Sequence, residues 1–328
     1  MIRHIYVEQE IAAHPRTRQI CNKFPNATII PCDRYTSVFN SNAQNFRLQK
    51  KNPSLILARK HQNRVTPTPA GYGIGSTQNY YFSHMLNCLY DCRYCFLQGM
   101  YRSAHYVVFV NYDDFIDDIR NIARESIDPS WFFSGYDCDS LAMEPVTGFI
   151  SYALDQFASC PSAHLEIRTK STQIRDLLAR DPIENAVIAY SLTPDTIASA
   201  LEHKAPSVEK RINSLKKLQN HGWKVGLRLD PMIHSATFKQ DYETLLDNIF
   251  SQLDCTNIHS VSFGSFRLPK GFYKKMVRLY PRERLFATDL TENNSMVSYG
   301  TEIEQECKSI LEALLLRHIS KSILFPCS

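Results

Sequence analysis

Three cysteines stand close together near the end of the first third of the chain. The segment reads Cys88-Leu-Tyr-Asp-Cys92-Arg-Tyr-Cys95, a C-x3-C-x2-C spacing. In a chain of 328 residues with ten cysteines, this spacing arises by chance about 0.01 times. Thiolates bind iron–sulfur clusters and zinc, so the triplet predicts a metal site.

An iron–sulfur cluster explains why there are three ligands. A [4Fe–4S] cubane usually takes one thiolate on each iron, so three cysteines leave one iron open. That iron can chelate the amino and carboxylate groups of S-adenosylmethionine (SAM). Electron transfer into the sulfonium then releases a 5′-deoxyadenosyl radical, which abstracts hydrogen from a substrate. The triplet therefore predicts a radical SAM enzyme, supplied with electrons by a donor such as a flavodoxin or ferredoxin.

Two other interpretations of the triplet remain open. The cysteines could hold zinc with a distant fourth ligand, such as a histidine or Cys255, or they could be unpaired core residues. Zinc sites favour paired C-x2-C units, which favours the cluster. Tyr94, just before the third cysteine, suits an aromatic packed near the adenine of SAM, although simple core packing would also explain it.

Composition is typical of a soluble globular enzyme. Hydrophobic residues make up 44% and charged residues 21%, with a net charge of +4. The start lacks an apolar signal region and no run of 18 apolar residues occurs, so we expect a cytoplasmic protein with no membrane segment. Cysteines are reduced there, which favours metal binding over disulfides. The mildly basic charge permits DNA as a partner, although basic runs such as 59–64 are often only solvated faces.

Apolar periodicity predicts alternating strands and helices from residue 80 onward. Expected strands and helices follow one another along the chain, and repeated β–α units imply parallel strands with right-handed crossovers. The expected strands lie at 80–86, 105–111, 131–135, 165–169, 186–192, 223–229 and 258–266, and the expected helices near 115–122, 146–157, 174–178, 212–218 and 242–253. Gly222 is expected to follow the end of a helix. The pattern predicts a partial (β/α) barrel at 80–268, after a small N-terminal α/β region with a linker (1–79) and before a helical C-terminal tail (269–328).

Four residues suited to a binding site lie at the ends of the expected strands. Gly135, Lys170, Ser191 and Asp230 each fall at or just after a strand end, as the cysteine segment does. Chemistry in such barrels gathers at the carboxyl ends of the strands. We therefore expect these residues to lie together around one site.

The sequence resembles the spore photoproduct lyase family of radical SAM proteins from about residue 80 to 290. The resemblance is carried by CLYDCRYCFLQ (88–98), VVFVNYDDF (107–115), DSLAMEPVT (139–147), EIRTKS (166–171), VIAYSLTPD (187–195), RINSLKKLQNHGWKVGLRLDPMI (211–233) and FGSFRLP (263–269). It implies a [4Fe–4S] cluster on the three cysteines and SAM contacts from Lys170, Ser191 and Tyr94. Each residue also has a simpler explanation. Lys170 could extend its ammonium from a strand end to solvent, Ser191 could be a hydrogen-bonded strand serine, and Tyr94 could pack in the core.

The resemblance also implies splitting of a thymine dimer, but two positions depart from the family pattern. The family's hydrogen-donating cysteine aligns with Tyr136, while Cys138 lies two residues further on and could replace it or be a small buried residue. The family's second tyrosine is Phe96 here, which has no phenol to relay hydrogen. Tyr94, Tyr136 and Cys138 are therefore the catalytic candidates.

The C-terminal region departs as well. The family's basic DNA-gripping hairpin corresponds to the acidic and polar segment 289–306, which would repel phosphates. Three functions stay open: repair of a DNA photolesion, radical SAM chemistry on RNA, a peptide or a small molecule, and a non-catalytic metal- or nucleic-acid-binding protein.

Overall fold

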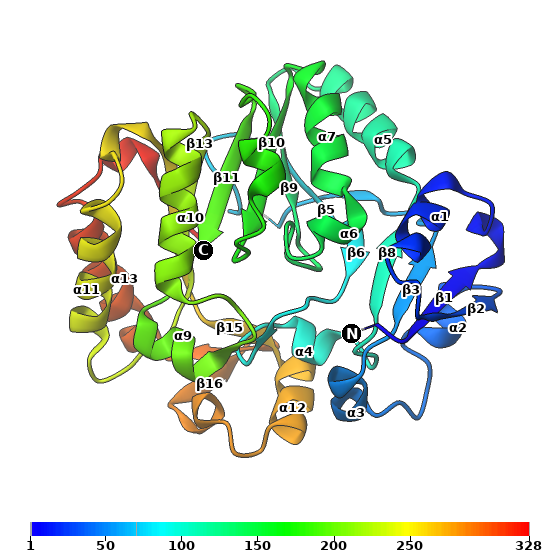
Figure 1. Ribbon diagram of the computed structural model, residues 1–328. Coiled ribbons are helices and arrows are strands. Elements are labelled where there is room, and N and C mark those ends of the chain that lie inside the picture. The colour runs from blue at the N-terminus through cyan, green and yellow to red at the C-terminus, as the bar shows by residue number, and fades with distance from the viewer. Residues whose placement is uncertain (1, 70, 328) are drawn as a thin grey trace.

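The computed structural model describes residues 2–69 and 71–327, and its largest element is a curled half-barrel sheet (Figure 1). The eight strands lie in the order β18-β14-β13-β11-β10-β9-β5-β4. Their bounds are β4 (Val65–Pro67), β5 (Asn79–Phe82), β9 (Ser130–Ser134), β10 (Ala163–Thr169), β11 (Ala186–Ser191), β13 (Lys224–Met232), β14 (Ile258–Ser265) and β18 (Leu324–Pro326). All neighbours pair in parallel except β4, which is antiparallel to β5. The partial barrel expected from the sequence is confirmed.

Helices cover the outer face of this sheet or lie at its strand ends. They are α5 (Tyr112–Glu125), α6 (Glu144–Thr147), α7 (Phe149–Ala158), α8 (Arg175–Leu178), α9 (Asp195–Leu201), α10 (Val208–Asn220), α11 (Phe238–Phe250) and α13 (Thr301–Leu315). Helix α10 shows the expected signals, because Ser207 accepts from the Lys210 backbone N–H at its start and Gly222 adopts φ +101° beyond its end. No helix in the described ranges is both long and apolar enough to cross a membrane.

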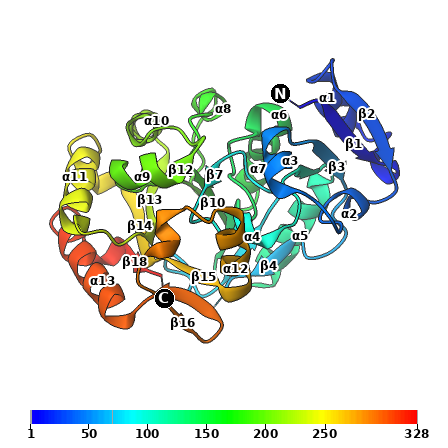
Figure 2. The ribbon, with the colours of Figure 1, turned by 90° about the horizontal axis from the view of Figure 1, so that it is seen from below.

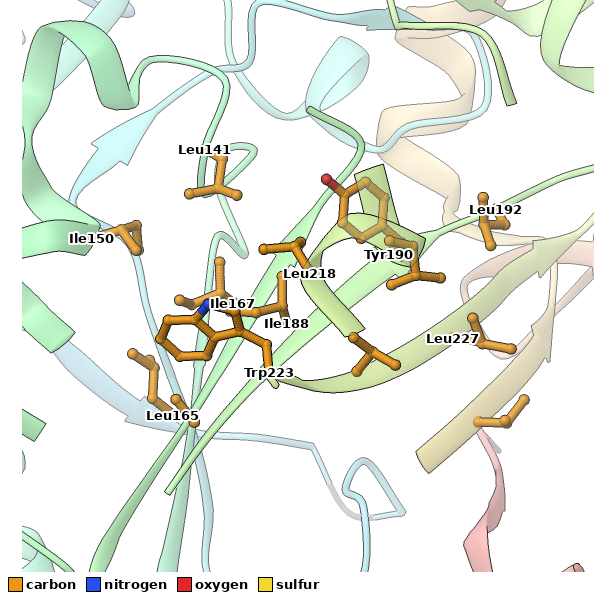
Figure 3. Close-up of a cluster of buried hydrophobic side chains, with 14 of the residues drawn as sticks. Leu141, Ile150, Leu165, Ile167, Ile188, Tyr190, Leu192, Leu218, Trp223 and Leu227 are labelled. Carbon is orange, nitrogen blue, oxygen red and sulfur yellow. The ribbon is translucent and has the colours of Figure 1, made fainter. Parts of the chain in front are cut away.

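Strand alternation separates the core from the barrel interior. Leu165 and Ile167 of β10 and Ile188 of β11 point outward into a cluster with Leu218 and Trp223 (Figure 3). Because successive side chains on a strand face opposite ways, the residues between them point into the barrel. That alternation makes polar positions such as 166, 168 and 191 available to a site inside the barrel.

A second sheet of five strands forms beside the barrel. Its order is β2-β1-β3-β8-β6, with β1 (His4–Glu8), β2 (Thr28–Cys32), β3 (Leu55–Ala58), β6 (Met85–Leu86) and β8 (Tyr106–Phe109). The helices α1 (Pro15–Asn22), α2 (Tyr35–Val38) and α3 (Phe46–Lys51) belong to the same N-terminal part of the chain.

The placement of β8 corrects one expectation. The apolar run 105–111 was expected in the barrel, but β8 pairs with β3 of the second sheet. All four residues of β8 are buried, so its apolar run is typical of a strand in either parallel sheet. The run 80–86 likewise divides between β5 in the barrel and β6 in the second sheet. The chain thus passes between the sheets, and the boundaries at 79/80 and 268/269 stay predictions.

The C-terminal region holds more than the expected helices. It contains β15 (Arg267–Pro269), α12 (Lys270–Leu279), β16 (Leu290–Asn293) and β17 (Met296–Tyr299), and Figure 2 labels the first three of these. The strands pair antiparallel in the order β15-β17-β16. A β-hairpin is therefore present at the segment expected to lack the family's hairpin. Short 3-10 turns complete the description at Gln9–Ile11, Cys255–Asn257, Arg284–Ala287 and Lys321–Ile323.

Candidate active site

One cavity of about 650 Å³ lies at the carboxyl ends of the barrel strands. Side chains from distant segments line it, including all eight residues that the sequence nominated: Cys88, Cys92, Tyr94, Cys95, Tyr136, Cys138, Lys170 and Ser191. Gly135 and Asp230 line it too, as expected from their places at strand ends. The fold therefore brings the candidates together, while the role of each stays a prediction.

The cysteine segment is held at two places. Its short strand β7 (Asp91–Cys92) pairs antiparallel with β12 (Glu202–His203), and the backbone N–H of Arg93 donates to the Leu201 carbonyl at 2.8 Å. The following helix α4 (Leu97–Met100) packs on α12 so closely that a Cβ on Gly99 would lie 2.5 Å from the Phe272 carbonyl oxygen. Glycine is thus needed at position 99.

The three thiols suit an iron–sulfur cluster. None of them forms a disulfide, and burial raises the pKa of all three, that of Cys88 to about 12. A cluster would bind them as thiolates and so offset this burial. Within residues 2–69 and 71–327, no three His, Cys, Asp or Glu side chains are close enough to hold a single metal ion, whereas a cubane takes each thiolate on a different iron.

A buried carboxylate organises the wall beside the cysteines. Glu202 accepts hydrogen bonds from the Tyr94 hydroxyl, the Arg211 guanidinium and, at 2.8 Å, the Thr193 hydroxyl. The ammonium of Lys170 lies 3.8 Å away. Burial alone would raise the pKa of Glu202, but Lys170 and Arg211 outweigh it and lower that pKa. Glu202 is therefore negatively charged and joins two cations from different parts of the chain, Lys170 after β10 and Arg211 of α10.

Lys170 supplies a positive charge to the cavity. Burial would lower its pKa, but Glu202 and Cys92 raise it above the usual value, so the ammonium stays charged. Asp139 fixes the backbone here, because it accepts from the Lys170 N–H at 2.6 Å and from the Thr169 hydroxyl at 2.7 Å. A fixed ammonium suits the carboxylate of a ligand.

Tyr136 and Cys138 occupy different surroundings. The Tyr136 ring is 43% exposed and stacks on Tyr81 with centroids 4.1 Å apart, and it lies 5.1 Å from the Phe96 ring. Cys138 is buried and packs in the core of the N-terminal sheet near Met85 while touching the cavity wall. The phenol therefore has the freer access to a ligand.

Tyr81 and Tyr136 also border a second pocket of about 610 Å³. It is lined by the basic cluster noted in the sequence, including Arg59 and Arg64. These guanidiniums are paired with carboxylates: Arg59 with Glu10 and Asp114, and Arg64 with Asp118. These ion pairs neutralise the cluster locally, which fits its interpretation from the sequence as a solvated face.

Sequence reasoning missed several residues of the cavity. Glu202 gave no signal, since its position at the end of α9 looks like any surface glutamate. Cys327 had no assigned role, yet β18 carries it to the cavity. Arg168 lay inside a quoted motif without a function, although it precedes Lys170 by two residues at the end of β10 and alternation turns both side chains to the same side of the sheet.

The half-barrel with three cysteines, a lysine and a serine around its strand ends is the architecture of a radical SAM enzyme. Comparison with known proteins narrows this class. The spore photoproduct lyase family profile matches residues 2–304. The chain is 23% identical to a spore photoproduct lyase of Clostridium acetobutylicum, over 92% of this chain and 89% of the relative, and 21% identical to that of Bacillus subtilis, over 90% and 86%.

Solved structures agree in fold. A cysteine-to-serine mutant of spore photoproduct lyase superposes with a TM-score of 0.87 at 16% identity, over 100% of this chain and 98% of the other. A spore photoproduct lyase complexed with dinucleoside spore photoproduct gives 0.85 at 17% identity with the same coverage. The chain belongs to the spore photoproduct lyase family, and it is a radical SAM enzyme of the lyase type.

Proposed function

We propose that this chain holds a [4Fe–4S] cluster on Cys88, Cys92 and Cys95, cleaves SAM reductively, and abstracts hydrogen from a thymine photolesion of the spore type in DNA. One observation carries the proposal: the nominated residues, distant in sequence, line one cavity. Related spore photoproduct lyases have been solved with SAM and with dinucleoside spore photoproduct. When bound, the cluster supplies the electron that cleaves the sulfonium.

The chain's own residues would bind and orient SAM. The Lys170 ammonium would pair with the SAM carboxylate, and its charge is maintained by Glu202. Tyr94 donates to Glu202 and lies beside the lysine, with its ring centroid 5.6 Å from the Nζ atom. Ser191 would add a hydroxyl from the end of β11. Together these groups would fix the sulfonium relative to the cysteines.

The substrate part of the proposal requires an extruded base. A dinucleotide lesion within a duplex cannot reach a cavity inside a barrel unless it leaves the base stack. The β16–β17 hairpin contributes Met296 to the cavity rim, which supports contact with the strand around the lesion. Its charge is small, because Glu292 pairs with Lys270. We therefore expect weaker binding to the phosphate backbone than a basic hairpin would give.

The return of hydrogen to the product is assigned to the Tyr136–Cys138 segment. Tyr136 presents a phenol to the cavity, whereas Cys138 presents a buried thiol. If the thiol donates, Cys138→Ala will change the distribution of products and leave SAM cleavage intact. Unchanged products would assign Cys138 to packing and leave Tyr136, tested by Tyr136→Phe.

A second candidate function is radical SAM chemistry on RNA, a peptide or a small molecule. The observation that favours it is the contact between the Phe96 and Tyr136 rings. Phe96 stands where the family has a tyrosine, and Tyr136 stands where the family has the hydrogen-donating cysteine. In either case the enzyme needs a one-electron donor, such as a flavodoxin or ferredoxin, and a reducing cytoplasm that keeps its thiols free.

The test is anaerobic reconstitution followed by two measurements. Electron paramagnetic resonance of the reduced protein should show a [4Fe–4S]⁺ signal that changes when SAM is added. The same sample should then convert dinucleoside spore photoproduct to thymidine products. Release of 5′-deoxyadenosine without lesion repair would move the function to the second candidate. A cluster indifferent to SAM would overturn both.

A further inference from the structure

The cavity has a polar floor that the proposed SAM contacts do not use. Arg168 and Asp230 form this floor, and both line the cavity. The Arg168 Nη1 atom donates to the Tyr72 hydroxyl at 2.9 Å and lies 3.3 Å from the Asp230 Oδ2 atom. Arg168 comes two residues before Lys170 near the end of β10, whereas Asp230 comes two residues after Arg228, the β13 residue that pairs with Ser191 of β11.

Two polar atoms at this floor lack partners. The Asp230 Oδ1 atom is buried and makes no hydrogen bond within residues 2–69 and 71–327, and the same holds for the hydroxyl of Ser265, which also lines the cavity. The two residues come from the neighbouring strands β13 and β14. Buried polar atoms in native proteins are nearly always hydrogen-bonded, so unpartnered ones that line a cavity point to a ligand.

The floor is electrically balanced. Behind it, Glu166 accepts from Arg228 at 2.7 Å and from the Arg168 Nε atom at 3.0 Å. Two carboxylates, Glu166 and Asp230, therefore face two guanidiniums. Such a set offers directional hydrogen bonds without net charge, which suits a neutral polar group better than a phosphate or a carboxylate.

We propose that Arg168 and Asp230 recognise the edge of a nucleobase, with the Asp230 Oδ1 atom accepting a ring or exocyclic N–H and Arg168 donating to the adjacent acceptor. The imide edge of thymine, with N3–H between two carbonyls, has this pattern. The choice of a substrate base rests on the proposed function. The adenine of SAM has the same donor-beside-acceptor chemistry, so the experiment must separate the two sources.

The experiment measures binding to the cluster-reconstituted protein by equilibrium dialysis. Three probes are used: dinucleoside spore photoproduct, the same compound methylated at N3 of both bases, and S-adenosylhomocysteine. Methylation removes the N–H that Asp230 would accept. We expect it to weaken binding to the wild type about tenfold or more, and to change binding to Asp230→Asn little. Asp155→Asn is the matched control, since that exposed aspartate also pairs with one arginine.

Each outcome decides the proposal. If Asp230→Asn binds the photoproduct more weakly and S-adenosylhomocysteine equally well, the floor recognises a substrate base. If it binds S-adenosylhomocysteine more weakly and the photoproduct equally well, the floor recognises adenine. Equal binding of both probes to the wild type and Asp230→Asn overturns the proposal. If the wild type does not bind the photoproduct, the proposed lesion function fails, and the S-adenosylhomocysteine comparison still tests the floor. Should Asp230→Asn not fold, equal binding of the methylated and unmethylated photoproduct by the wild type would overturn a substrate base.

Discussion

The two ends of the cavity are built on the same plan. At the cysteine end, Glu202 holds Arg211 inside the protein and Lys170 toward the cavity. At the floor, Glu166 holds a buried arginine, Arg228, and a second cation, Arg168, toward the cavity. In each case one cation is fully enclosed and the other lies at the cavity surface.

The difference lies in the outer cation. Lysine is a compact charge that binds a carboxylate from any direction, whereas the planar guanidinium of arginine makes directional hydrogen bonds. The cysteine end therefore suits the charged amino-acid part of SAM, and the floor suits a base edge. The enclosed arginines would then serve stability, and the outer cations would serve binding.

The largest effect is expected when one of the three cysteines at the cysteine end of the cavity is removed. Cys92→Ala removes one of three thiolates, so we expect loss of the cluster's magnetic resonance signal and of 5′-deoxyadenosine release. The control is Cys255→Ala, which removes a thiol that a zinc site could have used. Iron content and SAM cleavage in both variants check the prediction. Equal loss in the two variants would contradict a cluster held by the triplet alone.

Removing either central carboxylate should destabilise the fold. Glu166→Gln leaves Arg228 and Arg168 without their shared anion, and breaking a buried ion pair costs about 3–5 kcal/mol. Denaturant unfolding of the apoprotein measures the change. The control is Glu243→Gln, whose exposed pair with Arg317 is worth about 0–1 kcal/mol. A similar small loss in both variants would refute a structural role for the enclosed pair.

The outer cation at the cysteine end should affect binding more than stability. Lys170→Gln leaves Glu202 paired with Arg211, so the fold should be retained while S-adenosylhomocysteine binds about tenfold more weakly. Lys170→Arg should restore part of the affinity, because it restores the charge. Lys210→Gln, an exposed lysine of α10, is the control. Calorimetric titration measures the affinities, and unchanged binding in Lys170→Gln would contradict the assignment.

The sequence made one end of the cavity more predictable than the other. The cysteine triplet is contiguous, and Lys170 and Ser191 follow strands whose apolar pattern is clear, so their meeting could be expected from strand polarity. At the floor, Asp230 was expected at a strand end, but its pairing with Arg168 beside Ser265 could not be predicted, because the three residues come from three strands and no local pattern links them. Strand membership was also uncertain wherever a run was apolar on both faces, as at β8.

The smallest expected effect concerns His84, a buried titratable group that has no charged partner comparable to those of Glu166 and Glu202. His84 stacks on Phe149 with ring centroids 4.2 Å apart, and burial lowers its pKa from 6.5 to about 3. Between those values the unfolded chain binds a proton that the folded chain does not, so this contribution to stability is fully present above pH 6.5 and declines as pH falls. The slope is about 1.4 kcal/mol per pH unit.

His84→Phe keeps the stacking and should flatten the pH dependence of the free energy of unfolding between pH 6.5 and 5, measured by urea titration. If the free energy of unfolding kept the same slope against pH in His84→Phe, His84 would be charged in the folded protein. It would then not differ from the buried carboxylates Glu166 and Glu202, which stay charged beside their cations.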